Sequence, residues 1–313
     1  MSLGVLFPGQ GSQFVGMGAD LFEARPDLLG NAANDVLGFD LRKMCLEGPE
    51  KELTRTEHAQ PALFALSFAL WDEFRRSLEG TPSGMAGHSL GEYTALTAAN
   101  AVEFASSLGV VALRGRAMAA AADAEPSGMA ALIGADEELA QSVCAVRREM
   151  GGRLSVANIN SPGQIVVAGG AADIEWLVAE GRDHGIRRVI PLKVAGAFHS
   201  SFMASASESV ADGLGKVEIR EPEVPVWANA TASPHEESAI VSVLARQVVE
   251  PVRFMEILQN MSEAGISTYV HIGPGDVTAG LVRKTLPGAE AMVVSSIEDI
   301  SGVVDALGTM VQR

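Results

Sequence analysis

The sequence feature that most constrains the fold is the segment 87–91, which reads Gly-His-Ser-Leu-Gly. It follows the apolar pair Met85-Ala86 and leads into the helix-favouring segment 92–96. Glycines on both sides of Ser89 allow a sharp, strained turn from a strand into a helix. Such a turn exposes the serine hydroxyl and directs the following main-chain N–H groups towards a nearby oxyanion. The pattern therefore predicts a strand–turn–helix unit with Ser89 as a candidate nucleophile.

Composition and charge narrow the class of protein. The chain has 313 residues, 47% of them hydrophobic, which is enough for a sizeable core. Its start lacks the basic region of a signal peptide, and its longest apolar stretch, 61–71, is too short to span a bilayer. The formal net charge of −16 argues against nucleic acid or an anionic membrane as partner. We expect a cytoplasmic globular protein.

The sequence gives no sign of a permanently bound cofactor or metal. Cys45 and Cys144 are the only cysteines, and no paired Cys or His spacing suggests a metal site. The segment 9–11, Gly-Gln-Gly, lacks the further glycine or Lys-Ser/Thr that a nucleotide-binding loop requires. A glycine-rich turn after a first strand can instead place one main-chain N–H beside a site, and Gln10 is the obvious donor.

The order of predicted elements in 126–196 is strand, helix, strand, strand, helix, strand, which fits a ferredoxin-like subdomain inserted in a larger unit. The expected strands are 129–133, 154–159, 165–168 and 188–194, and the expected helices are 136–150 and 171–184.

The flanking parts, 1–125 and 197–313, alternate short strands with helices. Such alternation predicts a hydrolase-like α/β catalytic domain with a parallel sheet. We expect strands at 3–7, 225–228 and 268–272, and helices around 28–37, 61–78, 239–249 and 276–284.

A serine hydroxyl needs a base to become a nucleophile at neutral pH, and the chain has six histidines. His88 adjoins the serine and would point elsewhere on the turn, while His58, His184 and His235 lie in polar or loop-like contexts. His271 falls inside an expected strand. His199 follows a glycine at the end of a strand, a loop-like setting suited to catalysis, and is the better candidate.

Several basic residues are candidates for binding anions. Arg114 lies on an otherwise apolar, alanine-rich helix. It is either a surface arginine whose stem covers apolar neighbours, or it faces the site and binds a free carboxylate of an acyl group through both nitrogens. Arg187, Arg188 and Lys193 form a local basic cluster near the end of the inserted subdomain, where an anionic partner could bind, although such clusters are usually solvated.

Six ordered segments resemble one family, the malonyl-CoA:acyl carrier protein transacylases together with the acyltransferases of polyketide synthases. The resemblance covers nearly the whole chain. The segments are 7–13 (Phe-Pro-Gly-Gln-Gly-Ser-Gln), 87–93 (Gly-His-Ser-Leu-Gly-Glu-Tyr), 113–115 (Leu-Arg-Gly), 158–164 (Asn-Ile-Asn-Ser-Pro-Gly-Gln), 198–200 (Phe-His-Ser) and 273–275 (Gly-Pro-Gly).

The resemblance implies a malonyltransferase with Ser89 as acylated nucleophile and His199 as general acid and base. It implies Arg114 as the clamp for the malonyl carboxylate, and main-chain N–H groups of Gln10 and Leu90 as oxyanion donors. It also implies that Gln247 orients His199 through a carbonyl group, which makes a Ser-His dyad. Malonyl-CoA and acyl carrier protein would be the two substrates.

Substrate choice and pathway follow from the segment 196–199, Gly-Ala-Phe-His. It is similar to the form in malonyl-selective polyketide acyltransferases, in which Phe198 would fill the space beside the acyl α-carbon. The resemblance thus favours a trans-acting polyketide synthase acyltransferase, with a housekeeping fatty-acid malonyl transacylase as the alternative. A serine hydrolase or thioesterase, and a non-catalytic carrier-protein docking module, are the alternatives outside the family.

Overall fold

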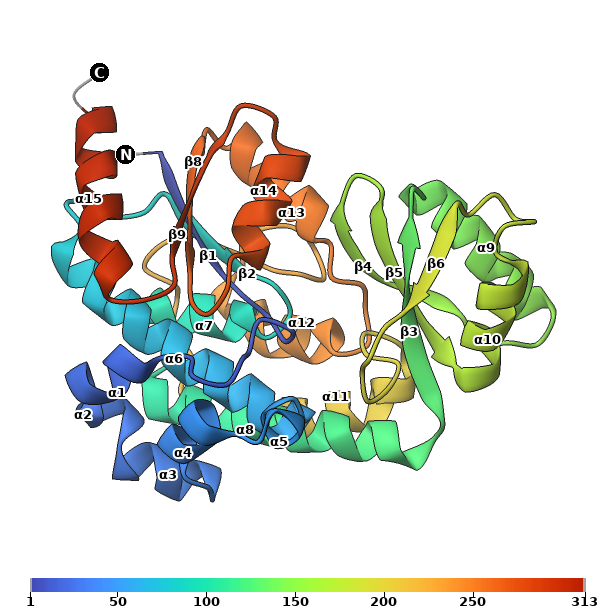
Figure 1. The fold of residues 1–313 in the computed structure, drawn as a ribbon, viewed down its shortest axis with the longest axis horizontal. Helices are drawn as coiled ribbons and strands as arrows, with labels where there is room; N and C mark the ends of the chain where they lie inside the picture. Colours follow the sequence, from blue (N-terminus) through green and yellow to red (C-terminus); the bar gives the residue numbers. More distant parts are fainter. Residues whose placement is uncertain (1, 312–313) are drawn as a thin grey trace.

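The computed structural model describes residues 2–311 and contains two β-sheets, seen side by side in Figure 1. The larger sheet has five strands in the order β7-β2-β1-β8-β9, and every neighbouring pair is parallel. Its strands are β1 (Leu3–Phe7), β2 (Gly84–Gly87), β7 (Val226–Trp227), β8 (Thr268–Ile272) and β9 (Glu290–Val294).

Helices cover both faces of the parallel sheet, as the alternation of side chains along β1 requires. Val5 and Phe7 belong to the hydrophobic cluster that contains α6 (Thr56–Ser77) and α15 (Glu298–Val311). Leu6 belongs to the opposite cluster, with α13 (Phe254–Glu263) and α14 (Val277–Thr285). The remaining helices outside the smaller sheet are α1 (Ala19–Ala24), α2 (Pro26–Leu29), α3 (Asn31–Leu37), α4 (Leu41–Glu47), α5 (Glu50–Leu53), α7 (Gly91–Ala98), α8 (Phe104–Ala124), α11 (Ala204–Leu214) and α12 (Ile240–Gln247), with short 3-10 helices at Ser201–Met203 and Glu237–Ala239.

The smaller sheet is antiparallel, with the order β4-β5-β3-β6. The strands are β3 (Ser127–Ile133), β4 (Ser155–Ser161), β5 (Gln164–Gly170) and β6 (Arg188–Pro191), and the helices are α9 (Glu137–Glu149) and α10 (Ala171–Glu180). Both helices pack in one cluster with Ala130, Leu132 and Val167. Met129, Val166 and Ala168 point the other way and join the core of the larger part. The sheet therefore has no solvent face at its centre.

The smaller sheet is fixed to the larger part beside β4. Ile159 donates its main-chain N–H to the carbonyl of Val252, and Val252 donates to the carbonyl of Ala157. Across the same boundary, Lys284 Nζ donates to Gln164 Oε1 at 3.2 Å. These bonds hold one face of β4 towards the carboxyl ends of β1 and β2, where the candidate site lies.

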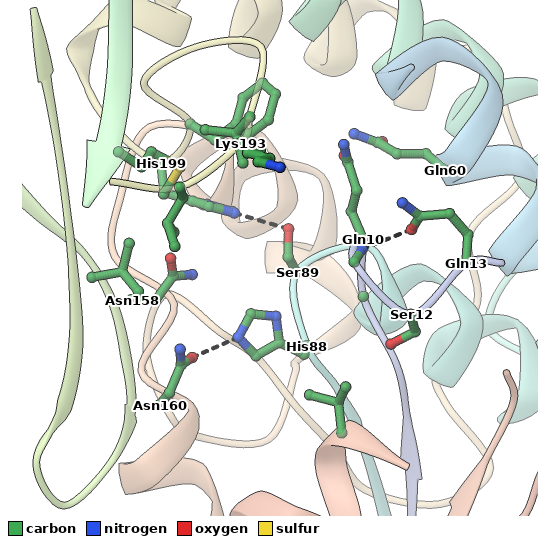
Figure 2. Close-up of a pocket in the computed structure, with 18 of the residues that line it drawn as sticks. Gln10, Ser12, Gln13, Gln60, His88, Ser89, Asn158, Asn160, Lys193 and His199 are labelled. Atoms are coloured by element: carbon green, nitrogen blue, oxygen red, sulfur yellow. Dashed lines mark hydrogen bonds between the residues drawn. The ribbon is translucent and has the colours of Figure 1, made fainter. Parts of the chain in front are cut away.

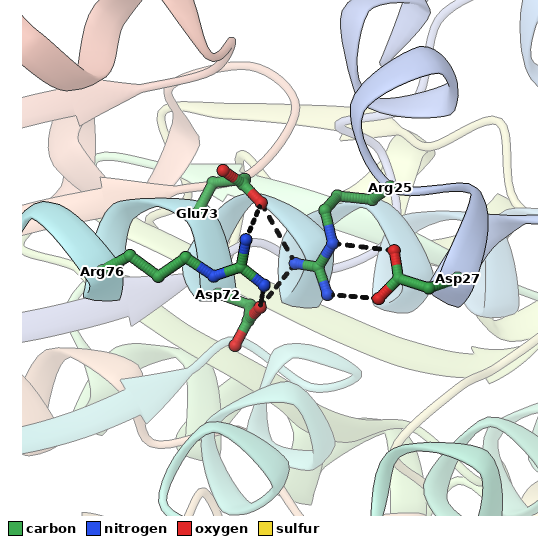
Figure 3. A network of polar contacts seen from close by, with 5 residues as sticks. All are labelled: Arg25, Asp27, Asp72, Glu73 and Arg76. Atoms are coloured by element: carbon green, nitrogen blue, oxygen red, sulfur yellow. Dashed lines mark hydrogen bonds and ion pairs between the residues drawn. The ribbon is translucent and has the colours of Figure 1, made fainter.

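A buried arginine attaches the first helices to α6 (Figure 3). The Arg25 side chain is 7% exposed and donates to Asp27 through two nitrogens, at 2.9 and 2.7 Å. It also bonds to Asp72 and Glu73 on α6, which Arg76 contacts from the other side. Hydrogen bonding to Asp27 raises the pKa of Arg25, against the desolvation that lowers it. The network is remote from the candidate site, and its position indicates a structural role.

The predicted fold class is confirmed: an α/β chain with a parallel sheet and an inserted βαββαβ unit. The strands expected at 3–7 and 268–272 have those bounds. The helix expected from Pro61 begins earlier, at Thr56, so that Pro61 lies inside it. The domain boundaries at 125/126 and 196/197 stay predictions. Among residues 2–311, we find no helical segment whose length and apolar character would let it span a bilayer.

Candidate active site

The turn at 87–91 is formed by close approach of main chain to main chain. A Cβ on Gly87 would lie 1.9 Å from the carbonyl carbon of Gly91, and one on Gly91 would lie 2.4 Å from the carbonyl oxygen of Phe7. Only glycine therefore fits at either position. Between them, Ser89 has a φ of +51°, a left-handed conformation that costs a non-glycine residue about 1–2 kcal/mol. The strained turn places the Ser89 hydroxyl at the carboxyl edge of the sheet.

Ser89 and His199 lie within hydrogen-bond distance although they are 110 residues apart, with Oγ 2.8 Å from Nε2 (Figure 2). His199 Nδ1 lies 2.7 Å from the main-chain carbonyl oxygen of Gln247. A carbonyl only accepts, so Nδ1 carries the proton and Nε2 is free to accept one from Ser89. Burial and, after it, the nearby positive charge of Arg114 lower the pKa of His199 to about 3, while the bond to the Gln247 carbonyl acts in the opposite direction. The imidazole is neutral at pH 7, as a base must be.

Arg114 is a fully buried cation beside Ser89. Its Nη2 donates to Ser89 Oγ at 3.0 Å and to Gln247 Oε1 at 2.9 Å, and its Nη1 donates to Gln60 Oε1 at 2.6 Å. Its Nε has no hydrogen-bond partner within residues 2–311. Its guanidinium lies 5.3 Å from the centre of the Tyr93 ring. Desolvation lowers the pKa of Arg114, and none of the salt bridges in the described part of the chain includes it.

The hydrogen-bond partners of this buried arginine are neutral, so its charge is available to bind an anion. The interpretation of Arg114 as a surface residue is wrong, because its exposed fraction is 0%.

The side chains of this site line a cavity of about 260 Å³ between the two sheets. Figure 2 shows Ser89 and His199 pointing towards one another, with His88 bonded to Asn160 on β4. His88 is half-buried, and desolvation lowers its pKa. The part of the wall from the smaller sheet is mainly amide and apolar: Met129, Asn158, Asn160, Gln164 and Val166. The cavity is therefore a mixed polar and apolar pocket with one buried cation.

Gln10 and Leu90 flank the nucleophile as the resemblance implies. Gln10 lines the cavity, and its side chain donates to Thr56 Oγ1 at 3.3 Å. Leu90 is buried at the amino end of α7. Within residues 2–311, neither main-chain N–H has a hydrogen-bond acceptor. Two unpaired N–H donors beside a serine match the requirements of an oxyanion hole, whose assignment stays a prediction.

The other predicted site residues are only partly brought together. Phe198 is 6% exposed and lines the cavity, next to His199 with its φ of +57°. Lys193 is exposed and also lines the cavity, whereas Arg187 and Arg188 are exposed but do not. The Gln247 side chain lies behind the site, bonded to Arg114 and to the Ser89 carbonyl.

Three polar residues beside the nucleophile were missed by the sequence analysis: Gln60, Glu92 and Asn229. Gln60 carried a usable signal, since it is a polar residue directly before the longest apolar stretch of the chain. Asn229 directly follows an expected strand, a position typical of site residues. His235, expected to be without function, is buried and pairs with Glu92.

The geometry supports covalent acyl transfer. Residues 2–311 contain no group of three or more His, Cys, Asp or Glu side chains that could hold a metal ion. A serine with a neutral base, two free N–H donors and a buried arginine can form an acyl ester and select an acyl group with a carboxylate.

Comparisons with known proteins agree with this chemistry. Residues 5–310 match the family described as acyl transferase domain. A malonyl CoA-acyl carrier protein transacylase of Bacillus subtilis is 40% identical over 305 residues, 96% of each chain. The polyketide biosynthesis protein ThaF of Burkholderia thailandensis is 39% identical over 282 residues, 90% of this chain and 24% of ThaF.

Solved structures show the same similarity. One is a malonyl-transacylase in complex with its type II polyketide synthase acyl-carrier protein. It has a TM-score of 0.91 and 35% identity, over 97% of this chain and 99% of that one.

Proposed function

The chain belongs to the acyl transferase domain family, and on that premise we propose that it moves a malonyl group from malonyl-CoA to the phosphopantetheine thiol of an acyl carrier protein. The observation that carries the proposal is the buried guanidinium of Arg114, which has neutral partners and lies 3.0 Å from Ser89 Oγ. A carboxylate at the far end of the acyl group would supply the missing counter-charge. Malonyl is a short acyl group that ends in such a carboxylate.

In the first half-reaction, His199 Nε2 takes the proton of Ser89 as Oγ attacks the thioester carbonyl. The main-chain N–H groups of Gln10 and Leu90 stabilise the resulting oxyanion, where losing one donor typically costs about 3 kcal/mol. The carbon–sulfur bond then breaks, and the proton on His199 goes to the sulfur of CoA. The product is a malonyl ester on Ser89.

In the second half-reaction, His199 takes the proton of the carrier-protein thiol, and the thiolate attacks the ester. The carbon–oxygen bond breaks, and the proton returns to Ser89 Oγ. The carbonyl of Gln247 holds the imidazole through its Nδ1 at 2.7 Å in both halves. Because no carboxylate of residues 2–311 is hydrogen-bonded to His199, the pair works as a dyad, which is sufficient for exchange between thioesters. The protein is unchanged after each cycle and needs no cofactor.

Selectivity and pathway form the finer part of the proposal. Phe198 lines the cavity next to His199 and would exclude a branch on the acyl α-carbon. One methyl group is worth only about 1–3 kcal/mol, so malonyl is preferred over methylmalonyl without being exclusive. We favour trans-acting polyketide synthesis, in the cytoplasm, from the Ala197-Phe198 pair. Housekeeping fatty-acid synthesis is the second candidate, favoured by the full-length similarity to the Bacillus transacylase.

The first test offers equal malonyl-CoA, methylmalonyl-CoA and acetyl-CoA to the intact protein, followed by a carrier protein, and measures the masses of both. We expect a malonyl adduct on Ser89 that then moves to the carrier. An adduct that only hydrolyses would support a hydrolase. If wild type and Ser89→Ala both stay unmodified, a docking module replaces the enzyme. Rates with carrier proteins of polyketide and fatty-acid origin separate the two pathways.

The carboxylate clamp is tested with Arg114→Ala in the same competition. We expect malonyl loading to fall strongly while acetyl loading rises relative to it, because the variant loses the cation that the carboxylate requires. A malonyl-to-acetyl ratio equal to that of wild type would remove Arg114 from substrate selection.

Docking of the carrier protein is proposed on Arg187, Arg188 and Lys193, a local basic patch on a chain with net charge −16. All three are exposed, and Lys193 lies at the cavity. Reversing their charges should raise the apparent KM for the carrier protein and leave acylation by malonyl-CoA intact. If the charge reversals change the rates of acylation and of transfer to the carrier protein equally, the carrier protein docks at another surface.

A further inference from the structure

Behind the nucleophile lies a buried carboxylate that the proposed mechanism does not use. The Glu92 side chain is 0% exposed, on the first turn of α7 and three residues after Ser89. It accepts three hydrogen bonds, from the main-chain N–H of Asn229 at 2.9 Å, from Gln247 Nε2 at 2.8 Å and from His235 Nε2 at 2.7 Å. An ionised carboxylate only accepts hydrogen bonds, and in that form Glu92 satisfies all three donors.

Asn229, one of the three donors, holds the strained turn itself. Its Oδ1 accepts from the main-chain N–H of Ser89 at 2.6 Å, and its Nδ2 donates to the carbonyl of Gly87 at 2.7 Å. One side-chain amide therefore pairs with the main chain on both sides of His88. Because Ser89 has a φ of +51°, these two bonds offset the strain of the conformation that exposes its hydroxyl. The position of Asn229 is fixed in turn by the bond from its own N–H to Glu92.

Gln247 connects the same carboxylate to the substrate side of the site. Its Nε2 donates to both Glu92 Oε2 and the carbonyl of Ser89, each at 2.8 Å. Its Oε1 accepts from Arg114 Nη2 at 2.9 Å. A carboxylate cannot pair with an amide oxygen, so the charge on Glu92 decides which end of the Gln247 amide faces Arg114.

Glu92 and Arg114 are opposite buried charges joined through one neutral amide. Both side chains are 0% exposed, and charges interact more strongly in the low-dielectric interior than at a surface. The carboxylate partly compensates the arginine without contacting it. Arg114 thus keeps its nitrogens available at the cavity, which a direct ion pair would occupy.

We propose that Glu92 is a positioning residue for acyl transfer, which acts through Asn229 on Ser89 and through Gln247 on Arg114. His235 completes the arrangement as the third donor to the carboxylate, and its Nδ1 has no partner within residues 2–311. The substrate aspect of this inference rests on the proposed malonyl transfer. Its effect on Ser89 does not, because the bonds to the turn are independent of the acyl group.

The test uses Glu92→Gln, which keeps the size and an acceptor oxygen but removes the charge. The matched control is Glu218→Gln, whose side chain is 73% exposed in a surface ion pair. Two single-turnover reactions are followed by intact mass: malonyl-CoA, and a fluorophosphonate that labels an activated serine without needing Arg114. Each gives a rate constant and a final stoichiometry. Glu92→Gln should slow both reactions about 10- to 100-fold at one label per chain, because small displacements at the nucleophile are that costly.

An unchanged rate constant in Glu92→Gln would overturn the proposal. A second result would also overturn it: fewer labels per chain, with the molecules that do react doing so at the wild-type rate. That result would mean that the substitution only unfolds part of the protein, which is a purely structural role. If Glu92→Gln does not fold, Asn229→Asp serves instead: it keeps the acceptor for Ser89 and loses the donor to Gly87. A wild-type protein that takes the fluorophosphonate but no malonyl group would contradict the proposed function and leave the positioning role testable.

Discussion

Gln60 determines how the Arg114 guanidinium is presented to the cavity. Its Oε1 accepts from Nη1 at 2.6 Å, and the residue is 1% exposed. A neutral amide satisfies the donor without neutralising the charge. The choice of glutamine over glutamate at this position therefore keeps the cation free for a carboxylate that arrives with the substrate.

We expect Gln60→Glu to reverse acyl preference. A carboxylate at this position would form a buried ion pair with Arg114 and repel the malonyl carboxylate, so the ratio of malonyl to acetyl loading should fall about 100-fold. Loading is measured by intact mass with both CoA esters present. Gln259→Glu on the exposed face of α13 is the control, and it should keep the wild-type ratio. An unaltered ratio in Gln60→Glu would show that the carboxylate binds elsewhere.

Ser89, His199 and Arg114 could be predicted from sequence because each lies in a short local pattern, a glycine turn, a strand end or an apolar helix. The contacts that support them could not, even where the residue itself carried a signal. Gln60 meets Arg114 across 54 positions of the chain, and Asn229 meets Ser89 across 140. Such pairs are made by the packing of distant elements, which no local pattern encodes.

At the scale of elements, the unit formed by β2 and α7 depends on the absence of two side chains. Gly87 and Gly91 meet so closely that neither leaves room for a Cβ. Replacing either requires the strand and the helix to separate, which would also move the N–H groups that follow Ser89.

Gly87→Ala should therefore abolish labelling of Ser89 and lower the free energy of unfolding by several kcal/mol, roughly the cost of overpacking with backbone displacement. The control is Gly302→Ala on α15, where a Cβ would meet nothing within 4 Å. There alanine should raise the free energy of unfolding by about 0.5–1 kcal/mol, since it favours the helix. Chemical denaturation and fluorophosphonate labelling measure both. An active Gly87→Ala would contradict the steric argument.

Element prediction was accurate where a strand is buried on both sides. Strand β1 is buried at all five positions and β8 at four of five, and both have the predicted bounds. The edge strand β9 was missed, because four of its five residues are partly or fully exposed and its pattern is weak. In β6, pairing with β3 ends at Pro191, which explains why the strand predicted for 188–194 is shorter.

At the scale of the whole molecule, several histidine side chains are removed from solvent and are neutral in the folded protein. Burial lowers the pKa of His199 to about 3 and that of His271 to about 4, and it lowers the pKa of His88 as well. Unfolding restores the ordinary value near 6.5 to each. Below that pH the unfolded chain binds protons that the folded chain does not.

The free energy of unfolding should consequently be constant above about pH 7 and fall as the pH drops from about 6.5 to 4, with a slope of up to about 4 kcal/mol per pH unit for three protons. Denaturant titrations at several pH values measure the slope. His271→Gln should reduce this slope by the share of one proton. If the free energy of unfolding does not change between about pH 6.5 and 4, these rings take up protons in the folded protein as readily as in the unfolded chain.

The buried cation of Arg114 is required for the choice of acyl group but lowers the stability of the fold, so activity and stability favour different residues at this position. A leucine or methionine there would relieve the fold of a desolvated charge and could make the protein harder to unfold while it loses its preference among acyl groups. Laboratory evolution for heat resistance alone would thus tend to discard this arginine. Libraries built on this scaffold should keep position 114 fixed, or screen for acyl choice in every round.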